Sequence, residues 1–388
     1  MAEAQTFVTG NGDQRRTLVV VFLRGGADGL NLVAPLQDAG YYNARPRIAI
    51  SKSNALPLDG FYGLNPLLKE LTPVYHDGAL AVIHAAGSED NTRSHFEAQD
   101  LMEHGGIAGG GWLGRFLRAQ KGISGPLAAV AVGKAVPECL RGAPTATVFQ
   151  SLDDFSFGFD RKQLLDDFSL GGDRNRLLAS LGRLYEAQPD SLGEAGRYTL
   201  EAVRRIEKLR TAVYHPGNGA NYGTDNFSQG LLQIARLIKA RVGLEAASLD
   251  LNGWDSHFGQ ATVMDPLMMR LARGLAAFYH DLGEEMGQTT VVVMTEFGRR
   301  VEENSAFGTD HGRGSVMFVM GGGIKGGRVL GKWPGLTKEV LEGPGDLPVV
   351  NNYRNVLAPI LARHGAGERL DQIFPGFSLS PMELYGEV

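Results

Sequence analysis

Several loops of the sequence carry carboxylate and imidazole side chains directly after runs of apolar residues. Five of these side chains could hold a metal ion: Asp28, Asp255, His257, Glu296 and His311. Carboxylate oxygens and imidazole nitrogens bind divalent cations such as Zn²⁺, Mn²⁺ and Ca²⁺. We therefore expect a site for one or two such ions, with Asp310 orienting its neighbour His311.

A serine and two arginines in similar loops could act on an anionic substrate. Ser94 stands at the start of an expected helix, where a metal ion would lower the pKa of its hydroxyl and make it a nucleophile. Arg93 or Arg299 could bind the oxygens of the transferred group. The helix start would favour the same negative charge. The predicted catalytic residues are therefore Ser94, Arg93 and Arg299.

Each of these side chains also has a purely structural explanation. Asp28 could cap a turn, Ser94 could cap its helix, and the pair Asp255 and His257 could only stabilise a loop. Glu296 is the strongest candidate, because an unpaired carboxylate directly after a buried strand is costly. Six other histidines lack this setting and are expected to be structural: His76, His84, His104, His215, His280 and His364.

The elements that would position these residues alternate between strands and helices. Buried strands are expected at the apolar runs 17–23, 79–86, 127–132, 244–251, 289–294 and 316–320. Helices are expected at 94–103, 227–240, 265–286 and 355–364, and a shorter one after Asn65 that ends or kinks at Pro73. This alternation predicts an α/β fold with a doubly wound, mostly parallel sheet flanked by helices. Ligands of such sheets bind beyond the carboxyl ends of the strands, where the candidate residues lie.

Residues 137–225 differ from the rest of the chain. Two long amphipathic stretches, 166–187 and 193–214, replace the alternating pattern. We interpret 137–225 as a helical insertion or cap within a single domain that spans 1–388. The glycine-rich run 321–327 lacks the spacing of a phosphate-binding loop, so a tight turn is the better interpretation.

The overall composition limits the partners. Hydrophobic residues make up 43% and charged residues 21%, which is typical of globular proteins. The net charge is −5 and no basic tract is present, which argues against nucleic acid as a main partner. No apolar run approaches the roughly 20 residues of a membrane span. Arg15 and Arg16 precede an apolar run that is too short for a signal core, and residues 1–12 could be a loose leader or a trimmed start.

Five segments together resemble the DUF1501 family, which has no settled function and is placed near the alkaline phosphatase and sulfatase superfamily. The segments occur at 22–31, 94–96, 253–257, 296–299 and 308–312, and the resemblance extends from about Arg16 to the C-terminus. It implies an alkaline-phosphatase-like fold and a periplasmic or secreted protein, although no signal peptide is visible in this chain.

The resemblance also implies roles for individual residues. Asp28, Asp255, His257 and His311 resemble metal ligands of the superfamily, and Ser94 lies where its Ser or Thr nucleophile begins a helix. Glu296-Phe297-Gly298 occupies the place of an Asp-His-Gly motif. Phe297 is the departure, because a phenyl ring replaces a metal-binding imidazole. One metal ion, or one tight and one weak, is therefore expected.

The leading hypothesis is a metal-dependent hydrolase that cleaves a small anionic phosphate or sulfate ester with Ser94 as nucleophile. The alternative, which Phe297 favours, is a catalytically degenerate metal-binding protein of the same fold that acts as a binding or assembly partner. A phosphomutase or transferase on the same scaffold is a third hypothesis. A homo-oligomer is compatible with the sequence.

Overall fold

A central mixed sheet dominates the protein, which we analyse from a computed structural model that describes residues 16–120, 125–152 and 174–386. Its strands follow the order β11-β5-β10-β9-β1-β8-β6-β7, and β12 also pairs with β5. Their bounds are β1 Thr17–Arg24, β5 Leu80–Gly87, β6 Ala129–Val132, β7 Thr147–Phe149, β8 Ala246–Asn252, β9 Thr289–Met294, β10 Ser315–Gly321, β11 Arg328–Leu330 and β12 Asn351–Asn352. β10 runs antiparallel to β5 and β9, and the other described pairs of this sheet are parallel.

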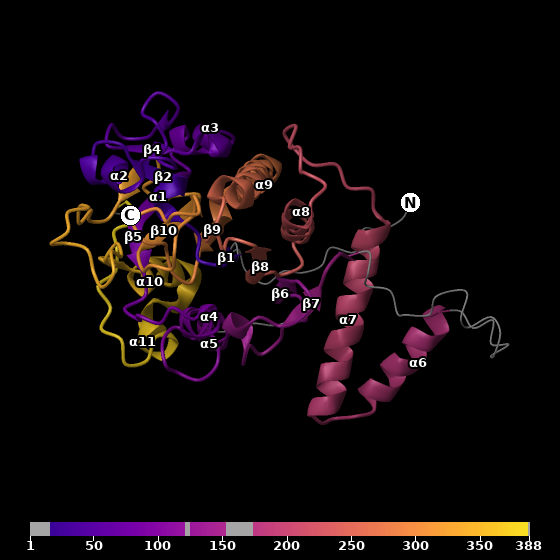
Figure 1. Cartoon of the computed structure of the whole chain (residues 1–388). Coiled ribbons are helices and arrows are strands. Elements are labelled where there is room, and N and C mark those ends of the chain that lie inside the picture. Colours follow the sequence, from indigo (N-terminus) through magenta and orange to yellow (C-terminus); the bar gives the residue numbers. More distant parts are fainter. Residues whose placement is uncertain (1–15, 121–124, 153–173, 387–388) are drawn as a thin grey trace.

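Helices cover both faces of this sheet (Figure 1). Alternate residues of β1 enter two different hydrophobic cores, because successive side chains of a strand point to opposite faces. On one face the core contains residues of α3 (Leu71–His76), α8 (Asn226–Lys239) and α9 (Gln260–Leu282). On the other it contains residues of α4 (His95–His104), α5 (Trp112–Ala119), α10 (Tyr353–Leu361) and α11 (Leu370–Ile373). The predicted α/β class, with a mostly parallel sheet flanked by helices, is confirmed.

A second, small sheet was not predicted from the sequence. It pairs β2 (Val33–Pro35), β3 (Leu56–Pro57) and β4 (Tyr62–Leu64), and two short helices adjoin it, α1 (Gly29–Leu32) and α2 (Ala39–Ala44). Its strands have only two or three residues, and two of the strands contain proline. No apolar periodicity in the sequence therefore predicts these strands. This region matters for the site because α2 is followed by Arg45.

Two helices differ from the predicted ones at proline residues. α9 begins at Gln260 rather than at residue 265, and it includes Pro266. α3 contains Pro73 instead of ending there. In α3 the proline lies in the first turn, where a helix does not need its missing N–H. A short 3₁₀ helix, η1 (Pro66–Leu68), accounts for the turn that Asn65 was expected to cap.

The range 137–225 contains both sheet and helix. It includes the 3₁₀ helix η2 (Glu138–Leu140) and then β7, which pairs with β6. Two helices follow, α6 (Arg174–Glu186) and α7 (Ser191–Thr211), while residues 166–173 of the first expected helix lie outside the described part. α6 and α7 project away from the sheet beyond β7 (Figure 1). That this range forms an insertion or cap stays a prediction.

The remaining short elements lie towards the C-terminus. They are η4 (Gly283–Gln288), the π-helical turn η5 (Ala362–Ala366) and η6 (Gly367–Arg369). Within the described ranges, no helix is long and apolar enough to cross a membrane.

Candidate metal centre

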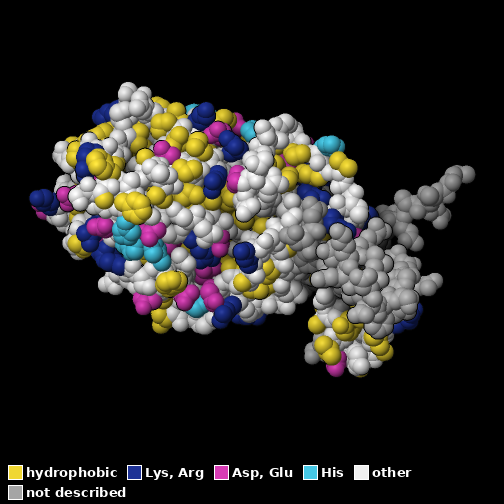
Figure 2. Space-filling view, turned by 45° about the vertical axis from the view of Figure 1, so that its right-hand side comes forward, with side chains coloured by type: hydrophobic (Ala, Val, Ile, Leu, Met, Phe, Trp, Pro, Cys, Tyr) yellow, Lys and Arg dark blue, Asp and Glu magenta, His cyan; other side chains and the backbone are white. Residues whose placement is uncertain are grey.

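Three histidines converge on the carboxylate of Asp255. Its Oδ1 lies 3.2 Å from Nε2 of His257, 3.3 Å from Nε2 of His311 and 3.5 Å from Nε2 of His95. The Nε2 atoms of His257 and His311 are 2.9 Å apart. The ligand atoms of His95, Asp255 and His311 all lie within 4.8 Å of one another. Histidine side chains gathered at the surface, between acidic and basic ones, are visible in Figure 2.

Loops at one edge of the large sheet bring these four residues together. Asp255 and His257 follow β8, and His95 is the first residue of α4, which follows β5. His311 lies in the loop between β9 and β10, where it forms an isolated bridge with Arg299. This is the edge at which ligands of such sheets are expected.

The opposite ring nitrogen of each histidine is held by an oxygen. The Nδ1 atom of His95 lies 2.8 Å from Glu296 Oε1, and that of His257 lies 3.2 Å from Asp310 Oδ1. The Nδ1 atom of His311 lies 2.8 Å from the carbonyl oxygen of Arg93. Because carboxylates and carbonyls accept hydrogen bonds, each Nδ1 carries the proton. Each ring therefore directs its Nε2 towards the cluster, where it could bind a metal ion.

This arrangement fits a metal ion. The Nε2 atoms of His257 and His311 lie 2.9 Å apart, a distance at which two unprotonated nitrogens repel each other unless a cation or a proton lies between them. The Nε2 of His95 is buried and has no hydrogen-bond partner. Burial lowers the pKa of His311, so a neutral ring is favoured there, whereas the hydrogen bond to Glu296 raises the pKa of His95. Three nitrogens and one carboxylate oxygen form a suitable donor set for a borderline divalent cation.

Asp255 remains ionised because of Arg299. Burial opposes the charge, but the hydrogen bond and positive charge of Arg299 outweigh it and lower the pKa of Asp255 to about 2. Arg299 Nη2 donates to Asp255 Oδ1 at 2.7 Å. The other donors of this buried guanidinium reach backbone carbonyls of Gly25, Gly26 and Thr309. Arg299 thus positions Asp255, and its donors are not free to clamp a substrate as the sequence had suggested.

Glu296 supports His95 in this geometry. Its Oε1 accepts hydrogen bonds from His95 Nδ1 at 2.8 Å, from Gln99 Nε2 at 2.9 Å and from the amide of Gly25 at 2.9 Å. Burial opposes its ionisation, but the hydrogen bonds from His95 and Gln99 lower its pKa. These contacts occupy the oxygen that faces the cluster, so the geometry favours an orienting role over the direct ligation expected from the sequence.

Asp28 is not brought into the cluster. Arg45 binds both of its oxygens, at 2.6 and 3.0 Å, and Gln260 donates to it at 2.7 Å. The side chains of Asp28 and Arg45 are essentially inaccessible, with 1% and 0% exposed. Arg45 follows α2 in the region of the small sheet, which sequence reasoning did not foresee. A metal-ligand role for Asp28 stays a prediction, and in this geometry Arg45 binds both of its oxygens.

Ser94 and Arg93 lie beside the cluster in the chain. Ser94 is the N-cap of α4, and its hydroxyl accepts from the amide of Glu97 at a long 3.4 Å. Arg93 Nη2 lies 2.5 Å from Asp346, and its Nη1 donates to the carbonyl of His311. Arg93 is partly exposed, so of the two predicted arginines it is the one that solvent can reach.

Phe297 packs against two of the histidines. Its ring centroid is 4.8 Å from that of His95 and 5.0 Å from that of His311. A side chain at Gly26 would clash with the phenyl ring, since a Cβ there would lie 2.6 Å from it. The phenyl ring therefore forms an apolar wall behind the imidazoles.

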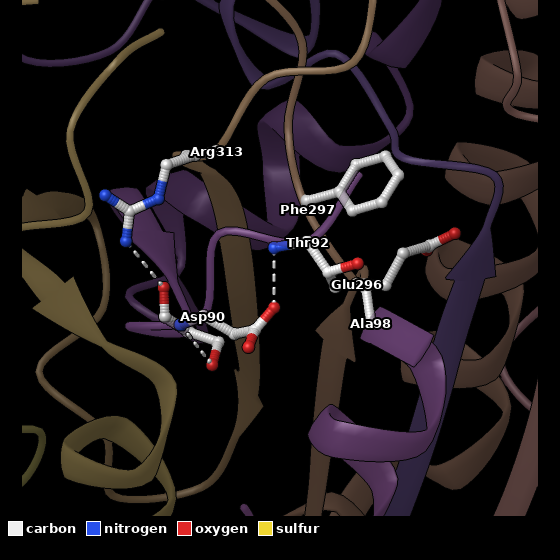
Figure 3. A pocket seen from close by; sticks show the side chains of 7 residues that line it. Asp90, Thr92, Ala98, Glu296, Phe297 and Arg313 are labelled. Atoms are coloured by element: carbon white, nitrogen blue, oxygen red, sulfur yellow. Dashed lines mark hydrogen bonds between the residues drawn. The ribbon is translucent and has the colours of Figure 1, made fainter. Parts of the chain in front are cut away.

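A small pocket adjoins this wall (Figure 3). Its lining residues are Ser88, Asp90, Thr92, Ala98, Glu296, Phe297 and Arg313. Asp90 accepts from the amide of Thr92 at 2.7 Å, and Arg313 donates to the carbonyl of Glu89 at 3.1 Å. The pocket places polar groups of the loop before α4 next to the residue that orients His95.

His95 is the cluster residue that sequence reasoning missed. It lies within a segment that carried the family resemblance, but only the serine before it was given a role. Its position directly after a strand-end loop and at a helix start was the available signal.

Close loop packing explains two glycines of the site. A Cβ at Gly25 would lie 2.6 Å from the amide of Asp255, and one at Gly298 would lie 2.0 Å from the carbonyl of Gly314.

Comparisons with solved structures find only distant similarities. A variant of the alkaline phosphatase PafA is 11% identical with a TM-score of 0.37, over 76% of this chain and 65% of that one. A Pyrococcus horikoshii protein is 10% identical with a TM-score of 0.31, over 80% and 86% of the two chains. The alkaline phosphatase of the Antarctic bacterium TAB5 is 10% identical with a TM-score of 0.28, over 80% and 93%. TM-scores below 0.5 assign no function.

The chain therefore spans about two thirds of the PafA chain that it matches. No curated protein matches the sequence. A family model does match: that of DUF1501, described as a protein of unknown function, covers residues 191–367 and so includes Asp255, His257, Glu296 and His311.

Proposed function

We propose that this protein is a metal-dependent hydrolase of small phosphate or sulfate esters, with a single divalent cation held by His95, Asp255, His257 and His311. The observation that carries the proposal is the convergence of three histidine Nε2 atoms on the Asp255 carboxylate. Imidazole-rich sites suit Zn²⁺ or a similar transition metal, whereas Ca²⁺ prefers six or more oxygens.

One ion is proposed because the other predicted ligands have different partners. Asp28 is neutralised by Arg45, and Glu296 is saturated by hydrogen bonds on its inner oxygen. Asp310 accepts from His257, to which it acts as an orienting carboxylate. A second cation would therefore lack a set of free donors among these residues.

A bound cation would polarise an ester oxygen and lower the pKa of a nearby hydroxyl or water. The surrounding residues favour an anionic substrate. The N-terminus of α4 begins at the site and carries partial positive charge, and the partly exposed Arg93 lies beside it. Ser94 is the proposed nucleophile, because its hydroxyl has only a long capping bond of 3.4 Å and adjoins His95 in the chain.

Metal analysis and an ester screen test this proposal together. The purified protein, stripped with chelator and reloaded, should bind one Zn²⁺ or Mn²⁺ per chain and hydrolyse aryl phosphates or sulfates. His311→Ala should lose both properties. His280→Ala is the matched control, because His280 is exposed on α9 and outside the cluster.

The outcomes separate the alternatives. A parent protein that binds no divalent cation would contradict the proposal outright. One that binds a cation but hydrolyses no ester would leave the binding-protein alternative. A periplasmic or secreted location is also proposed, on the family resemblance alone, and fractionation of cells that express the full gene would test it.

A further inference from the structure

One face of α4 carries a ladder of polar side chains that leads away from the cluster. His95, Gln99 and Glu103 are spaced four residues apart, so they lie on the same side of the helix. Gln99 and Glu103 both contact Arg24 at the end of β1, where Nη1 lies 3.2 Å from Gln99 Oε1 and 2.7 Å from Glu103 Oε2. The ladder therefore connects His95 with a partly buried arginine.

Arg24 is itself held on several sides. Its Nε and Nη2 bind the two oxygens of Asp250 at 2.8 and 3.1 Å. Its guanidinium carbon lies 4.4 Å from the centre of the Phe22 ring. Hydrogen bonds and charge attraction from Glu103 and Asp250 raise the pKa of Arg24 against the effect of burial, so the cation is permanent. This guanidinium is a rigid donor.

The rigid donor fixes the orientation of the Gln99 amide. Arg24 offers only N–H groups, so the oxygen of the amide must face it. The amide nitrogen then points to Glu296 and donates to Oε1 at 2.9 Å. The same oxygen accepts from His95 Nδ1 at 2.8 Å, so the position of the carboxylate depends on Gln99 as well as on His95.

We infer that Gln99 and Arg24 are positioning residues for the metal ligand His95, an inference that rests on the proposed metal-dependent function. Neither residue belongs to the cluster itself. Arg24 orients the Gln99 amide, and the amide holds the Glu296 carboxylate. The carboxylate keeps the proton of His95 on Nδ1 and aims Nε2 at Asp255. Loss of such a partner typically weakens metal binding by about 10–100-fold.

The test replaces Gln99 by methionine, which is similar in length and has no amide. The metal affinity of the full chain is measured by competition with a coloured chelator, using Zn²⁺ and then Co²⁺, whose visible absorption reports its ligands. Gln99→Met should bind Zn²⁺ about 10–100-fold more weakly and shift the Co²⁺ spectrum. Asp100→Asn, an exposed position on the same helix, should change neither.

A second variant protects the test against misfolding. Gln99→Asn keeps the amide but is one methylene too short to contact both Arg24 and Glu296, so it should also weaken binding. In the metal-free protein, NMR of the imidazole nitrogens should show the Nδ1–H form of His95 in the parent and a mixture of forms in either variant.

Two results would overturn the inference in distinguishable ways. If the parent binds no divalent cation, the proposed function fails and the inference fails with it. If the parent binds a cation and both Gln99 variants keep its affinity and Co²⁺ spectrum, the metal site stands and the positioning role is wrong.

Discussion

The substitution Asp28→Asn distinguishes a metal ligand from a structural ion pair. Asparagine keeps the shape of the side chain but leaves the buried guanidinium of Arg45 without its counterion. Breaking a buried pair by removing one partner costs about 3–5 kcal/mol. For a chain of 388 residues, at about 2.1 cal/mol/K of unfolding entropy per residue, 4 kcal/mol corresponds to a fall of about 5 °C in Tm.

The assay combines calorimetry with metal titration. Asp28→Asn should lower Tm by about this amount and leave the metal affinity of the folded protein within about twofold of the parent's, because Asp28 contacts Arg45 and Gln260 rather than the cluster. Replacing both partners, Asp28→Leu with Arg45→Met, should cost less than Asp28→Asn alone, since no charge is left buried. An Asp28→Asn protein with unchanged Tm and greatly weakened metal binding would refute this reasoning and restore Asp28 as a ligand.

Three further substitutions give separate expectations. Ser94→Ala should abolish ester turnover if the hydroxyl is the nucleophile, and should cost about 0.5–2 kcal/mol of stability through the lost helix cap, as rate assays and a thermal melt would measure. Burial lowers the pKa of His84 to about 4, below its ordinary value of 6.5, so the unfolded chain binds more protons. In urea titrations His84 alone should therefore contribute a fall in stability of about 3 kcal/mol between pH 6.5 and 4, so the loss should be smaller in His84→Gln than in the parent. Gly298→Ala should be destabilising by several kcal/mol in denaturant melts, because the added Cβ would lie 2.0 Å from the carbonyl oxygen of Gly314.

Controls make these outcomes decisive. Ser94→Thr is the control, because it keeps both a hydroxyl and a capping group. Retained turnover in Ser94→Ala would point to water as the nucleophile. If the stability of His84→Gln depended on pH as strongly as that of the parent, His84 would not be the source of the predicted loss at low pH. Gly109→Ala, where a Cβ would meet no atom within 4 Å, should be tolerated.

The strands could be predicted from the sequence, because parallel strands buried on both faces consist of continuous apolar runs. β1 and β9 are such runs, and the polar residues that follow β8 and β9 lie at the predicted edge. The roles of individual site residues could not be predicted from the sequence, because they depend on contacts between distant segments. Glu296 was predicted to be a metal ligand, and its contact with His95, 201 residues earlier in the chain, could not be predicted from the sequence. The ion pair between Asp28, another predicted ligand, and Arg45 could not be predicted either.

The small sheet explains why the ion pair of Asp28 with Arg45 could not be predicted from the sequence. Arg45 reaches Asp28 only because the backbone around α2 folds over the loop that contains Val301, whose carbonyl Arg45 also binds at 2.8 Å. The strands of the small sheet are too short for hydrophobic periodicity to reveal them. Tertiary contact, rather than local preference, decides the partner of each carboxylate.

The convergence of the histidines has a consequence for stability as well as for chemistry. Cys139 is the single cysteine, so the chain cannot form an internal disulfide. A cation held by Asp255 and His311 would tie together two loops 56 residues apart, and His95 would join them from the start of α4. Because the ion binds these side chains only where the fold brings them together, it would stabilise the folded state by mass action. Chelation should therefore speed unfolding of the whole sheet, and metal supply would govern how long each molecule survives heat or protease.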